Sequence, residues 1–393
     1  MSLNIGIYNL NLSTRGGGEK RTLVLAEHWS RSYRVRLLVG EAPDVPALER
    51  YFGVDLSRVE VVVLGDLRKQ QGTSRFQQSV LAADLDHFRR IRALGLDVFV
   101  NNSFYSTLPS PAPRGLYVCM FPHRLVPEPV AARPLRRLAY RALWTGGWWT
   151  VGRRPRILDS YQAIASNSAF TTHWIETWWK RTPTTLYSVC DGVGRGGAKE
   201  KVIVHVGRFQ PHKRQDVLLQ AFARASSLHR AGWHLHFVGS TAPEDAAFLA
   251  DLRREARGLP VTFHPDADLH TLRALYQSAA IYWHATGYGF DPETHPSAQE
   301  HFGVTTVEAM SAGAVPVVIN SGGQRETVTH QHDGLLWDDL EQLLAYTQQL
   351  ADDAPLRRRL SDAAVQSSAR FSRDAFNARY DALLAQLMSA QRV

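Results

Sequence analysis

The sequence predicts an α/β protein with two doubly wound parallel sheets. Short β-rich runs alternate with helical patterns in both halves of the 393-residue chain, as in strands joined by crossover helices. A polar, glycine-rich stretch at 190–201 separates the two sets, and its composition favours a linker. The chain length also favours two domains over one. Ligands bind at the carboxyl ends of the strands in such sheets, so two binding edges are expected across a shared cleft.

The two halves carry a similar succession of elements. The first half predicts strands at "NIGIYNL", "YRVRLLVG", "VEVVVLG", "DVFVNN", "YVCMF" and "AIASNS". The second half predicts strands at "VIVHVGR", "HLHFVG", "VTFH", "IYWHA" and "VPVVI", with helices over 213–228, 244–257 and 268–279. We therefore expect a Rossmann-like domain over 1–192 and another over 200–371. The chain closes on an amphipathic pattern at 371–387 that predicts a helix.

The composition is that of a globular protein, with 44% hydrophobic and 21% charged residues. No run approaches the roughly 20 apolar residues of a membrane span. The first residues lack a basic region and a cleavage site, so they predict a strand and not a signal peptide. The two cysteines, Cys119 and Cys190, give neither a disulfide framework nor a metal spacing, which fits a reducing cytoplasm. A cytoplasmic protein is the expectation.

The net charge of +8 is unevenly distributed. Residues 1–195 hold 26 Lys and Arg against 15 Asp and Glu, and the segment 133–156 alone holds seven arginines and three tryptophans. A basic amphipathic helix with Trp suits an anionic membrane surface, which predicts peripheral contact with the inner face of a membrane. A helix packed on its own domain with solvated arginines is the alternative. Nucleic acid is not an expected partner, because no recognised binding module is present.

A glycine-rich loop, "STRGGGEK" at 13–20, directly follows the first predicted strand. Gly16, Gly17 and Gly18 allow positive φ angles and close backbone approach to a ligand. A helix beginning near Glu19 would point its free N–H groups at the loop and favour an anion there. The glycines are contiguous, so the loop is not the G-x-G-x-x-G dinucleotide fingerprint. A tight strand-to-helix turn explains them equally well.

Two basic residues follow the first strand of the second half, in "VGRFQPHKRQDVLLQAF" at 206–222. The strand is expected to end at Gly207, and Arg208 and Lys213 lie in the connection to the next helix. Two cations at a strand end, facing a helix N-terminus, suit a diphosphate. Solvated surface residues are the simpler alternative, although the position after a strand favours the diphosphate.

Two glutamates, Glu300 and Glu308, bracket the start of "EHFGVTTVEAMSAGAVPVV". On one continuous helix they would lie about 12 Å apart, which fits neither carboxylate geometry of glycosidases. The run from Thr305 to Glu308 instead matches a capping box, with Thr305 as N-cap. Glu300 then lies in a loop, and the N–H groups of 302–305 surround a helix start that attracts anions. A cap alone for Glu308 and an exposed loop acid for Glu300 are the alternatives.

A second glycine pair, Gly322 and Gly323, follows the strand "VPVVI" and precedes another helix. Together with the loop at 16–18, the turn after Gly207 and the start at 302–305, it places glycines, cations and helix starts at predicted strand ends. This conjunction is more specific than any one of its members.

These segments resemble the retaining glycosyltransferases of family 4, which have the GT-B architecture. The resemblance rests on "RGGGEK", "IASNSAFT" at 164–171, "VGRFQPHKRQDVLLQAF" and "EHFGVTTVEAMSAGAVPVVINSGGQRETV", and it covers nearly the whole chain. The last segment carries the E-x7-E signature. The resemblance implies two Rossmann-like domains facing a central cleft, the first binding the acceptor and the second the nucleotide-sugar donor. It also implies that the last helix, 372–393, crosses back to the first domain.

The resemblance implies a role for each motif residue. The glycine loop approaches the donor phosphates, and Arg208 and Lys213 bind the diphosphate and stabilise it as leaving group. Glu300 contacts hydroxyls of the donor sugar, and Glu308 holds the ribose hydroxyls. The implied donor-binding set is Gly16, Gly17, Gly18, Arg208, Lys213, Phe302, Gly303, Val304, Thr305 and Glu308. The implied catalytic set is Glu300, Arg208, Lys213 and His123.

Two departures from the family pattern bear on specificity. Many members carry a histidine beside the donor sugar, after a strand of the first domain. In "YVCMFPHRLV" that position falls on Met120, and His123 either replaces the histidine or is a surface loop residue. The segment 285–299, before Glu300, is longer than in simple members and is expected to shape donor or acceptor choice.

The implied activity is that of a hexosyltransferase that retains anomeric configuration. It would move a sugar from a UDP- or GDP-sugar to a hydroxyl of a glycan, lipid-linked or small-molecule acceptor. No cofactor or metal is expected, since Arg208, Lys213 and helix dipoles meet the phosphate charge, and Asp84 and Asp86 lie at i,i+2 in a helical pattern. The alternatives are a nucleotide-sugar hydrolase or epimerase, or a catalytically silent binding subunit.

Overall fold

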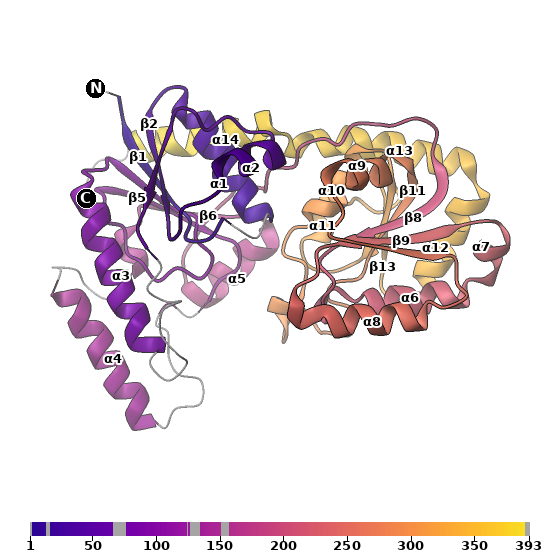
Figure 1. The fold of residues 1–393 in the computed structure, drawn as a ribbon, viewed down its shortest axis with the longest axis horizontal. Coiled ribbons are helices and arrows are strands. Elements are labelled where there is room, and N and C mark those ends of the chain that lie inside the picture. Colours follow the sequence, from indigo (N-terminus) through magenta and orange to yellow (C-terminus); the bar gives the residue numbers. More distant parts are fainter. Residues whose placement is uncertain are drawn as a thin grey trace. The chain divides into compact units, whose positions relative to one another are not determined.

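The computed structural model describes residues 2–12, 16–65, 76–123, 125, 134–150 and 157–389, and the side chains of 76–81 and 134–141 lie outside this description. The chain divides into two compact units (Figure 1). Unit 1 comprises Met1–Asn167, Thr171–Leu186 and Asn377–Val393, and unit 2 comprises Ser168–Phe170 and Tyr187–Phe376.

Unit 1 is built on a parallel sheet with strand order β3-β2-β1-β4-β5-β6-β7. The order reverses between β1 and β4, which makes the carboxyl ends of these two strands the switch point where such sheets bind ligands. The strands are β1 (Asn4–Tyr8), β2 (Arg34–Val39), β3 (Val59–Val63), β4 (Val98–Asn101), β5 (Arg114–Cys119), β6 (Ala163–Ser166) and β7 (Thr184–Thr185).

The helices of unit 1 bury the apolar faces of this sheet. They are α1 (Gly17–Ser30), α2 (Val45–Phe52), α3 (Phe76–Ala93), α4 (Pro134–Trp149), α5 (Ala169–Trp179) and α14 (Arg373–Ser389). The indole of Trp29 on α1 donates to Asp381 on α14 at 2.9 Å, which fixes the later part of the last helix within unit 1. The first residues of α5 group with unit 2, where Glu326 accepts from the N–H groups of Ala169 and Phe170 at 2.6 and 2.7 Å.

Unit 2 repeats the design with strand order β10-β9-β8-β11-β12-β13. Its strands are β8 (Glu200–Val206), β9 (His234–Gly239), β10 (Val261–Pro265), β11 (Ala279–His284), β12 (Val315–Ile319) and β13 (Leu335–Trp337). All pairings between neighbouring strands of the two sheets are parallel. The prediction of two doubly wound parallel sheets is therefore confirmed. The cleft expected between them stays a prediction.

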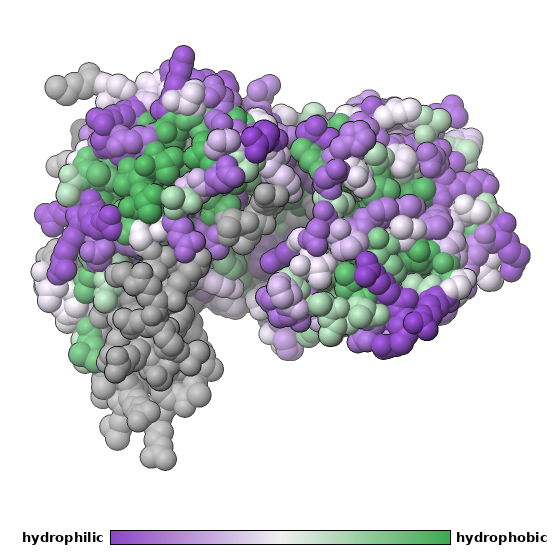
Figure 2. Space-filling view, viewed as in Figure 1, coloured by the Kyte–Doolittle hydropathy of each residue, from purple (hydrophilic) through white to green (hydrophobic). Residues whose placement is uncertain are grey.

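Helices cover both faces of the unit 2 sheet (Figure 1). One buried cluster joins the sheet to α6 (Gln215–Arg224), α7 (Ser226–Arg230), α8 (Ala246–Glu255) and α12 (Leu340–Asp352). A second joins the opposite face to α9 (Leu269–Ser278), α10 (Val304–Ser311) and α13 (Ala354–Ser368). Figure 2 shows hydrophilic residues over α7 and the nearby ends of α6 and α8, as expected for helices with one buried face.

The segment predicted as a linker packs onto unit 2 instead. Cys190 lies in a buried cluster with Phe302 and Phe371. The ammonium of Lys199 donates to the carbonyls of Gln277 and Ala312 at 2.8 and 2.7 Å. The change from unit 1 to unit 2 therefore falls at 186–187 and not at the predicted 192–200, because these contacts tie the glycine-rich stretch to α9 and α10.

The basic aromatic segment 133–156 is partly described, over 134–150. Trp144 and Trp148 are fully buried, and Trp148 meets Phe88 edge to face at 5.8 Å. Trp149 is 58% exposed. The helix is thus anchored on its own unit by two tryptophans, while Arg133 and 151–156 lie outside the described residues. None of the described helices is long and apolar enough to cross a membrane.

Candidate functional site

The predicted residues of unit 2 meet at the carboxyl ends of its central strands. Lys213 ends a single 3-10 turn (Pro211–Lys213) after β8, and Glu300 precedes α10. The Lys213 ammonium lies 2.9 Å from a carboxylate oxygen of Glu300, and the two side chains are 20% and 19% exposed. The structure therefore brings together two residues that lie 87 positions apart in the chain.

His284, the last residue of β11, also contacts Glu300. Its Nε2 lies 3.2 Å from the same Glu300 oxygen that Lys213 contacts. Burial acts to raise the pKa of Glu300, but Lys213 and His284 outweigh it and hold that pKa well below its usual range. Burial lowers the pKa of His284 itself. Glu300 is thus an ionised carboxylate with a cationic partner and a neutral one.

Arg208 lies on the same connection as Lys213 but points into solvent. Among the described residues, its guanidinium makes no hydrogen bond or ion pair. The turn beneath it is fixed by Gln215, whose amide donates to the Arg208 carbonyl at 2.8 Å. The site thus offers one exposed cation and one cation held by Glu300.

The start of α10 differs from the predicted capping box. The helix begins at Val304, its N-cap is Gly303 with φ 103°, and no side chain caps it. Thr305 is the second helical residue, and its hydroxyl shares a 2.8 Å hydrogen bond with that of Tyr282. A helix leaves its first N–H groups without an internal acceptor, so those of Val304 and Thr305 suit an anion. The N-cap thus lies two residues before the predicted one, and anion binding at this helix start stays a prediction.

Glu308 lies in the second turn of α10 and accepts a hydrogen bond from the hydroxyl of Tyr276 at 3.2 Å. Tyr276 is fully buried on α9. The sequence suggested that Glu308 caps the helix, and this is wrong. Its carboxylate is half-buried and is oriented by the buried Tyr276.

Gly322 and Gly323, the glycine pair after β12, pack against the backbone of 300–302. The N–H of Gly323 donates to the Glu300 carbonyl at 2.7 Å. A Cβ on Gly322 would lie 2.3 Å from that carbonyl oxygen, and one on Gly323 would lie 2.5 Å from the Cα of Phe302. The glycines are thus explained by backbone packing against 300–302.

Unit 1 contains the other predicted residues. Gly16 has φ −98° and caps α1, and Gly17 and Gly18 already belong to the helix, so none of them uses the positive φ that was expected. The N–H of Gly16 donates to Glu19 at 2.9 Å. A Cβ on Gly18 would meet the Met120 methyl at 2.7 Å. Met120, at the position where the resemblance predicted a histidine, therefore packs against the glycine loop.

His123 is packed among aromatic rings. Its Nε2 lies 3.2 Å from the Ser106 carbonyl, and its ring meets those of Tyr105 and Trp179 edge to face at 5.1 and 5.7 Å. Burial lowers the pKa of His123 to about 4, so the ring is neutral near pH 7. These contacts account for His123 as a packed residue of unit 1, and its catalytic role stays a prediction.

Asp84 and Asp86 do not form a pair. Asp84 is buried and accepts a hydrogen bond from Thr107, whereas Asp86 pairs with Arg90 on its own helix.

Sequence reasoning missed His284 and Tyr276. The signal for His284 was a single histidine at the end of an otherwise apolar strand, "IYWHA". Tyr276 carried no signal, because a tyrosine on a helix is commonly a core residue.

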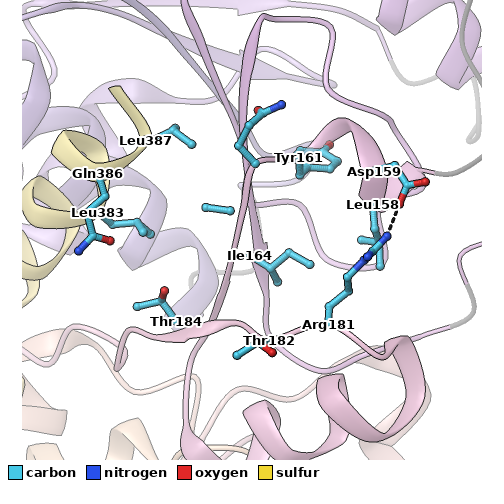
Figure 3. Close-up of a pocket in the computed structure, with 12 residues that line it drawn as sticks. Leu158, Asp159, Tyr161, Ile164, Arg181, Thr182, Thr184, Leu383, Gln386 and Leu387 are labelled. Carbon is cyan, nitrogen blue, oxygen red and sulfur yellow. Dashed lines mark hydrogen bonds and ion pairs between the residues drawn. The ribbon is translucent and has the colours of Figure 1, made fainter. Parts of the chain in front are cut away.

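A separate pocket of about 590 Å³ lies in unit 1 (Figure 3). It is formed by the start of β6, the connection before β7 and the end of α14, and the Asp159–Arg181 ion pair lies in its wall. The amino ends of strands form this pocket, and none of the predicted site residues lines it.

The C-terminal part of the chain is similar to known proteins. Residues 195–367 match the family Glycosyl transferases group 1. A GDP-Man:Man(3)GlcNAc(2)-PP-Dol alpha-1,2-mannosyltransferase of Yarrowia lipolytica is 31% identical over 35% of this chain and 22% of the relative. A D-inositol 3-phosphate glycosyltransferase of Jonesia denitrificans is 29% identical over 56% of this chain and 55% of the relative. The matches thus span between about a fifth and about half of these relatives.

Solved structures show the same fold over the whole chain. Anabaena HepE in complex with UDP and glucose superposes with a TM-score of 0.68 at 15% identity, covering 98% of this chain and all of HepE. Sucrose-phosphate synthase of Thermosynechococcus elongatus superposes with a TM-score of 0.72 at 18% identity, covering 99% of this chain and all of that enzyme. The fold of this protein is therefore the GT-B fold of two Rossmann-like units.

Proposed function

We propose that this protein is a retaining, metal-independent hexosyltransferase of family 4 that uses a UDP- or GDP-sugar. The observation that carries the proposal is the pairing of Lys213 with Glu300 beside the open start of α10. The group 1 match over 195–367 covers all of these residues. Glu300 and Glu308 occupy the two positions of the E-x7-E signature.

The site suits departure of a nucleoside diphosphate from a sugar. Breaking this bond places negative charge on phosphate and positive charge on the sugar ring. The first N–H groups of α10 are fixed donors for the phosphate charge, and Arg208 and Lys213 would supply two cations for it. In a front-side displacement with retention, the leaving phosphate helps to deprotonate the acceptor hydroxyl. Arg208 and Lys213 would neutralise the phosphate charge that a metal ion would otherwise neutralise. Removal of metal by EDTA is therefore expected to leave the rate unchanged.

Glu300 and Glu308 would bind opposite ends of the donor. A carboxylate accepts two hydroxyl hydrogen bonds well, which suits Glu308 and a ribose diol. Glu300 would accept from hydroxyls of the sugar. Phe302 to Thr305 connect the two glutamates around the helix start.

Unit 1 would bind the acceptor, with Gly16, Gly17 and Gly18 approaching the donor phosphates. A glycan, a lipid-linked sugar or a small molecule is proposed as acceptor. Lipid-linked acceptors agree with peripheral contact of 133–156 with an anionic membrane, and with a cytoplasmic protein. Co-sedimentation with anionic vesicles at low salt tests that contact, and absence of binding would refute it.

The decisive experiment measures product formation from UDP- and GDP-sugars with and without acceptor, each with and without EDTA. A glycoside product that forms only with acceptor and keeps the anomeric configuration of the donor supports the proposal. Free sugar or an epimerised nucleotide sugar without acceptor indicates the hydrolase or epimerase. Binding of donor with no product indicates a silent binding subunit.

A further inference from the structure

Glu300 is held by two side chains that approach it from different elements. Lys213 comes from the turn before α6, and His284 comes from the end of β11. In the proposed function the donor diphosphate competes with Glu300 for the three N–H donors of the Lys213 ammonium. The contact of His284 with Glu300 is not subject to this competition.

The hydrogen-bonding pattern fixes which nitrogen of His284 carries the proton. Its Nε2 lies 3.2 Å from Glu300 and 3.2 Å from the Thr286 hydroxyl. An ionised carboxylate only accepts, so Nε2–H must be the donor to Glu300. Nδ1 is buried and has no hydrogen-bond partner among the described residues, which identifies it as the bare nitrogen. His284 is thus a neutral imidazole with one N–H directed at Glu300.

His284 is also held rigidly. It is 1% exposed and ends β11, which pairs with β8 on one side and β12 on the other. The ring of His205, on β8, lies 6.2 Å away, and His205 is itself fixed by a 2.9 Å hydrogen bond to the Trp283 carbonyl. A donor on a central strand varies less in position than one on a loop. Lys213, by contrast, is on a flexible four-carbon stem.

We propose that His284 is a positioning residue for Glu300. Its Nε2–H keeps the carboxylate aimed at the donor sugar while the diphosphate competes for the Lys213 ammonium. The inference rests on the proposed function of Glu300 and Lys213. It adds a group that need not touch either substrate.

Two substitutions separate the hydrogen bond from the bulk of the ring. His284→Phe fills the same space but cannot donate. His284→Gln keeps an amide N–H that can reach the place of the imidazole Nε2–H. We expect His284→Phe to lower kcat on the order of 10²-fold, the effect of misplacing a group by about 1 Å, and His284→Gln to recover most of that loss. The dissociation constant for the nucleoside diphosphate alone should stay unchanged, since that ligand lacks the donor sugar that Glu300 is proposed to contact.

A matched control removes a hydrogen bond made by Trp283, the neighbour of His284 on the same strand. The indole of Trp283 donates to Thr347 at 2.9 Å in the core of unit 2. Thr347→Val removes this buried hydrogen bond without touching Glu300, so it should lower the melting temperature while kcat stays the same. If His284→Phe behaves like this control, or if it weakens diphosphate binding as much as it lowers kcat, His284 is only a structural residue.

A second measurement does not depend on transfer. In ¹⁵N-histidine NMR spectra at pH 7, His284 is expected to show a protonated Nε2 and a bare Nδ1, before and after addition of UDP or GDP. Glu300→Gln should shift the Nε2–H resonance. The Nδ1–H tautomer would overturn the proposal even if the Phe variant does not fold. Absence of transfer by the wild-type protein, with the expected spectrum, refutes the proposed function and leaves the His284–Glu300 pairing standing.

Discussion

At the residue scale, the Lys213–Glu300 ion pair bears on how the proposed donor would bind. Each side chain satisfies the charge of the other. Glu300→Ala removes the proposed sugar contact and also releases Lys213. We expect kcat to fall about 10²-fold, in the range of two lost hydrogen bonds to a charged group, while UDP or GDP alone binds as tightly as before or more tightly.

Steady-state kinetics and calorimetry with the nucleoside diphosphate check both parts. Glu255→Ala, which changes an exposed acid at the end of α8, serves as the control and should match the wild type. Transfer at the wild-type rate by the Glu300 variant would contradict the site assignment.

Substitution of Glu308 should lower nucleotide affinity rather than kcat. Glu308→Gln keeps the size of the side chain and removes its charge, so the ribose hydroxyls lose a charged acceptor. The dissociation constant for UDP or GDP should rise about 10- to 10²-fold, as for a hydrogen bond to a charged group, with kcat at saturating donor within a few-fold of wild type. Tyr276→Phe, which removes only the hydroxyl that orients Glu308, should show a smaller rise. Equal loss of kcat and affinity would place Glu308 at the reacting centre.

Buried histidines predict acid sensitivity. Burial lowers the pKa of His205 to about 3 and that of His301 to about 4, so the unfolded chain takes up these protons first as the pH falls. The stability that their neutral forms contribute is complete above about pH 6.5 and is lost as the pH falls toward these values. His205→Asn, which can still donate to the Trp283 carbonyl, should reduce the slope of unfolding free energy against pH by up to about 1.4 kcal/mol per pH unit.

Urea unfolding between pH 4.5 and 7 measures this slope. Thr347→Val should lower stability at every pH without changing the slope. A slope that is the same in wild type and His205→Asn would show that His205 is not the group that titrates.

At the element scale, α10 shows where the sequence pattern misled. Thr305-to-Glu308 matches a capping box, yet the helix starts at Val304. The left-handed Gly303 is its N-cap, and the hydroxyl of Tyr282 shares a hydrogen bond with that of Thr305. The two elements that contact this helix start, β11 and the turn after β12, are distant from it in sequence. A local motif could therefore locate the helix start within two residues but not choose between local and tertiary partners.

Gly303 gives the corresponding prediction. At φ 103° a non-glycine residue is strained, and a Cβ there would lie 2.8 Å from the Gln324 amide nitrogen. Gly303→Ala is expected to lower the free energy of unfolding by about 1–3 kcal/mol and to weaken diphosphate binding by displacing the start of α10. Chemical denaturation and calorimetry measure the two effects. Gly197→Ala, where a Cβ would meet nothing within 4 Å, is the control and should change stability by less than about 0.5 kcal/mol.

At the scale of the whole molecule, the alternation of strands and helices was enough to predict both sheets. The sequence also predicted Lys213 and Glu300 at strand ends of one sheet edge, and the structure brings these two residues together. The place of Glu308 in the donor site stays a prediction. It could not show that the glycine-rich stretch 190–201 packs on unit 2. The polar, glycine-rich composition there predicted a linker. Instead, Lys199 donates to carbonyls at the ends of α9 and α10, and Cys190 is buried in a cluster with Phe302. Composition does not encode such contacts.

The division into two units predicts how a donor would stabilise the protein. Arg208, Lys213, Glu300 and Glu308 all belong to unit 2, so nucleotide alone should stabilise that unit. A ligand at 100 times its dissociation constant adds about 2.7 kcal/mol to the unfolding free energy, which is about 5–11 °C for a unit of this size. In a thermal-shift panel of UDP, GDP and their sugars, one base should give this shift and the other a smaller one. Glu308→Gln should lose most of this shift and Glu255→Ala should keep it. A shift that survives Glu308→Gln would mean that the nucleotide binds elsewhere.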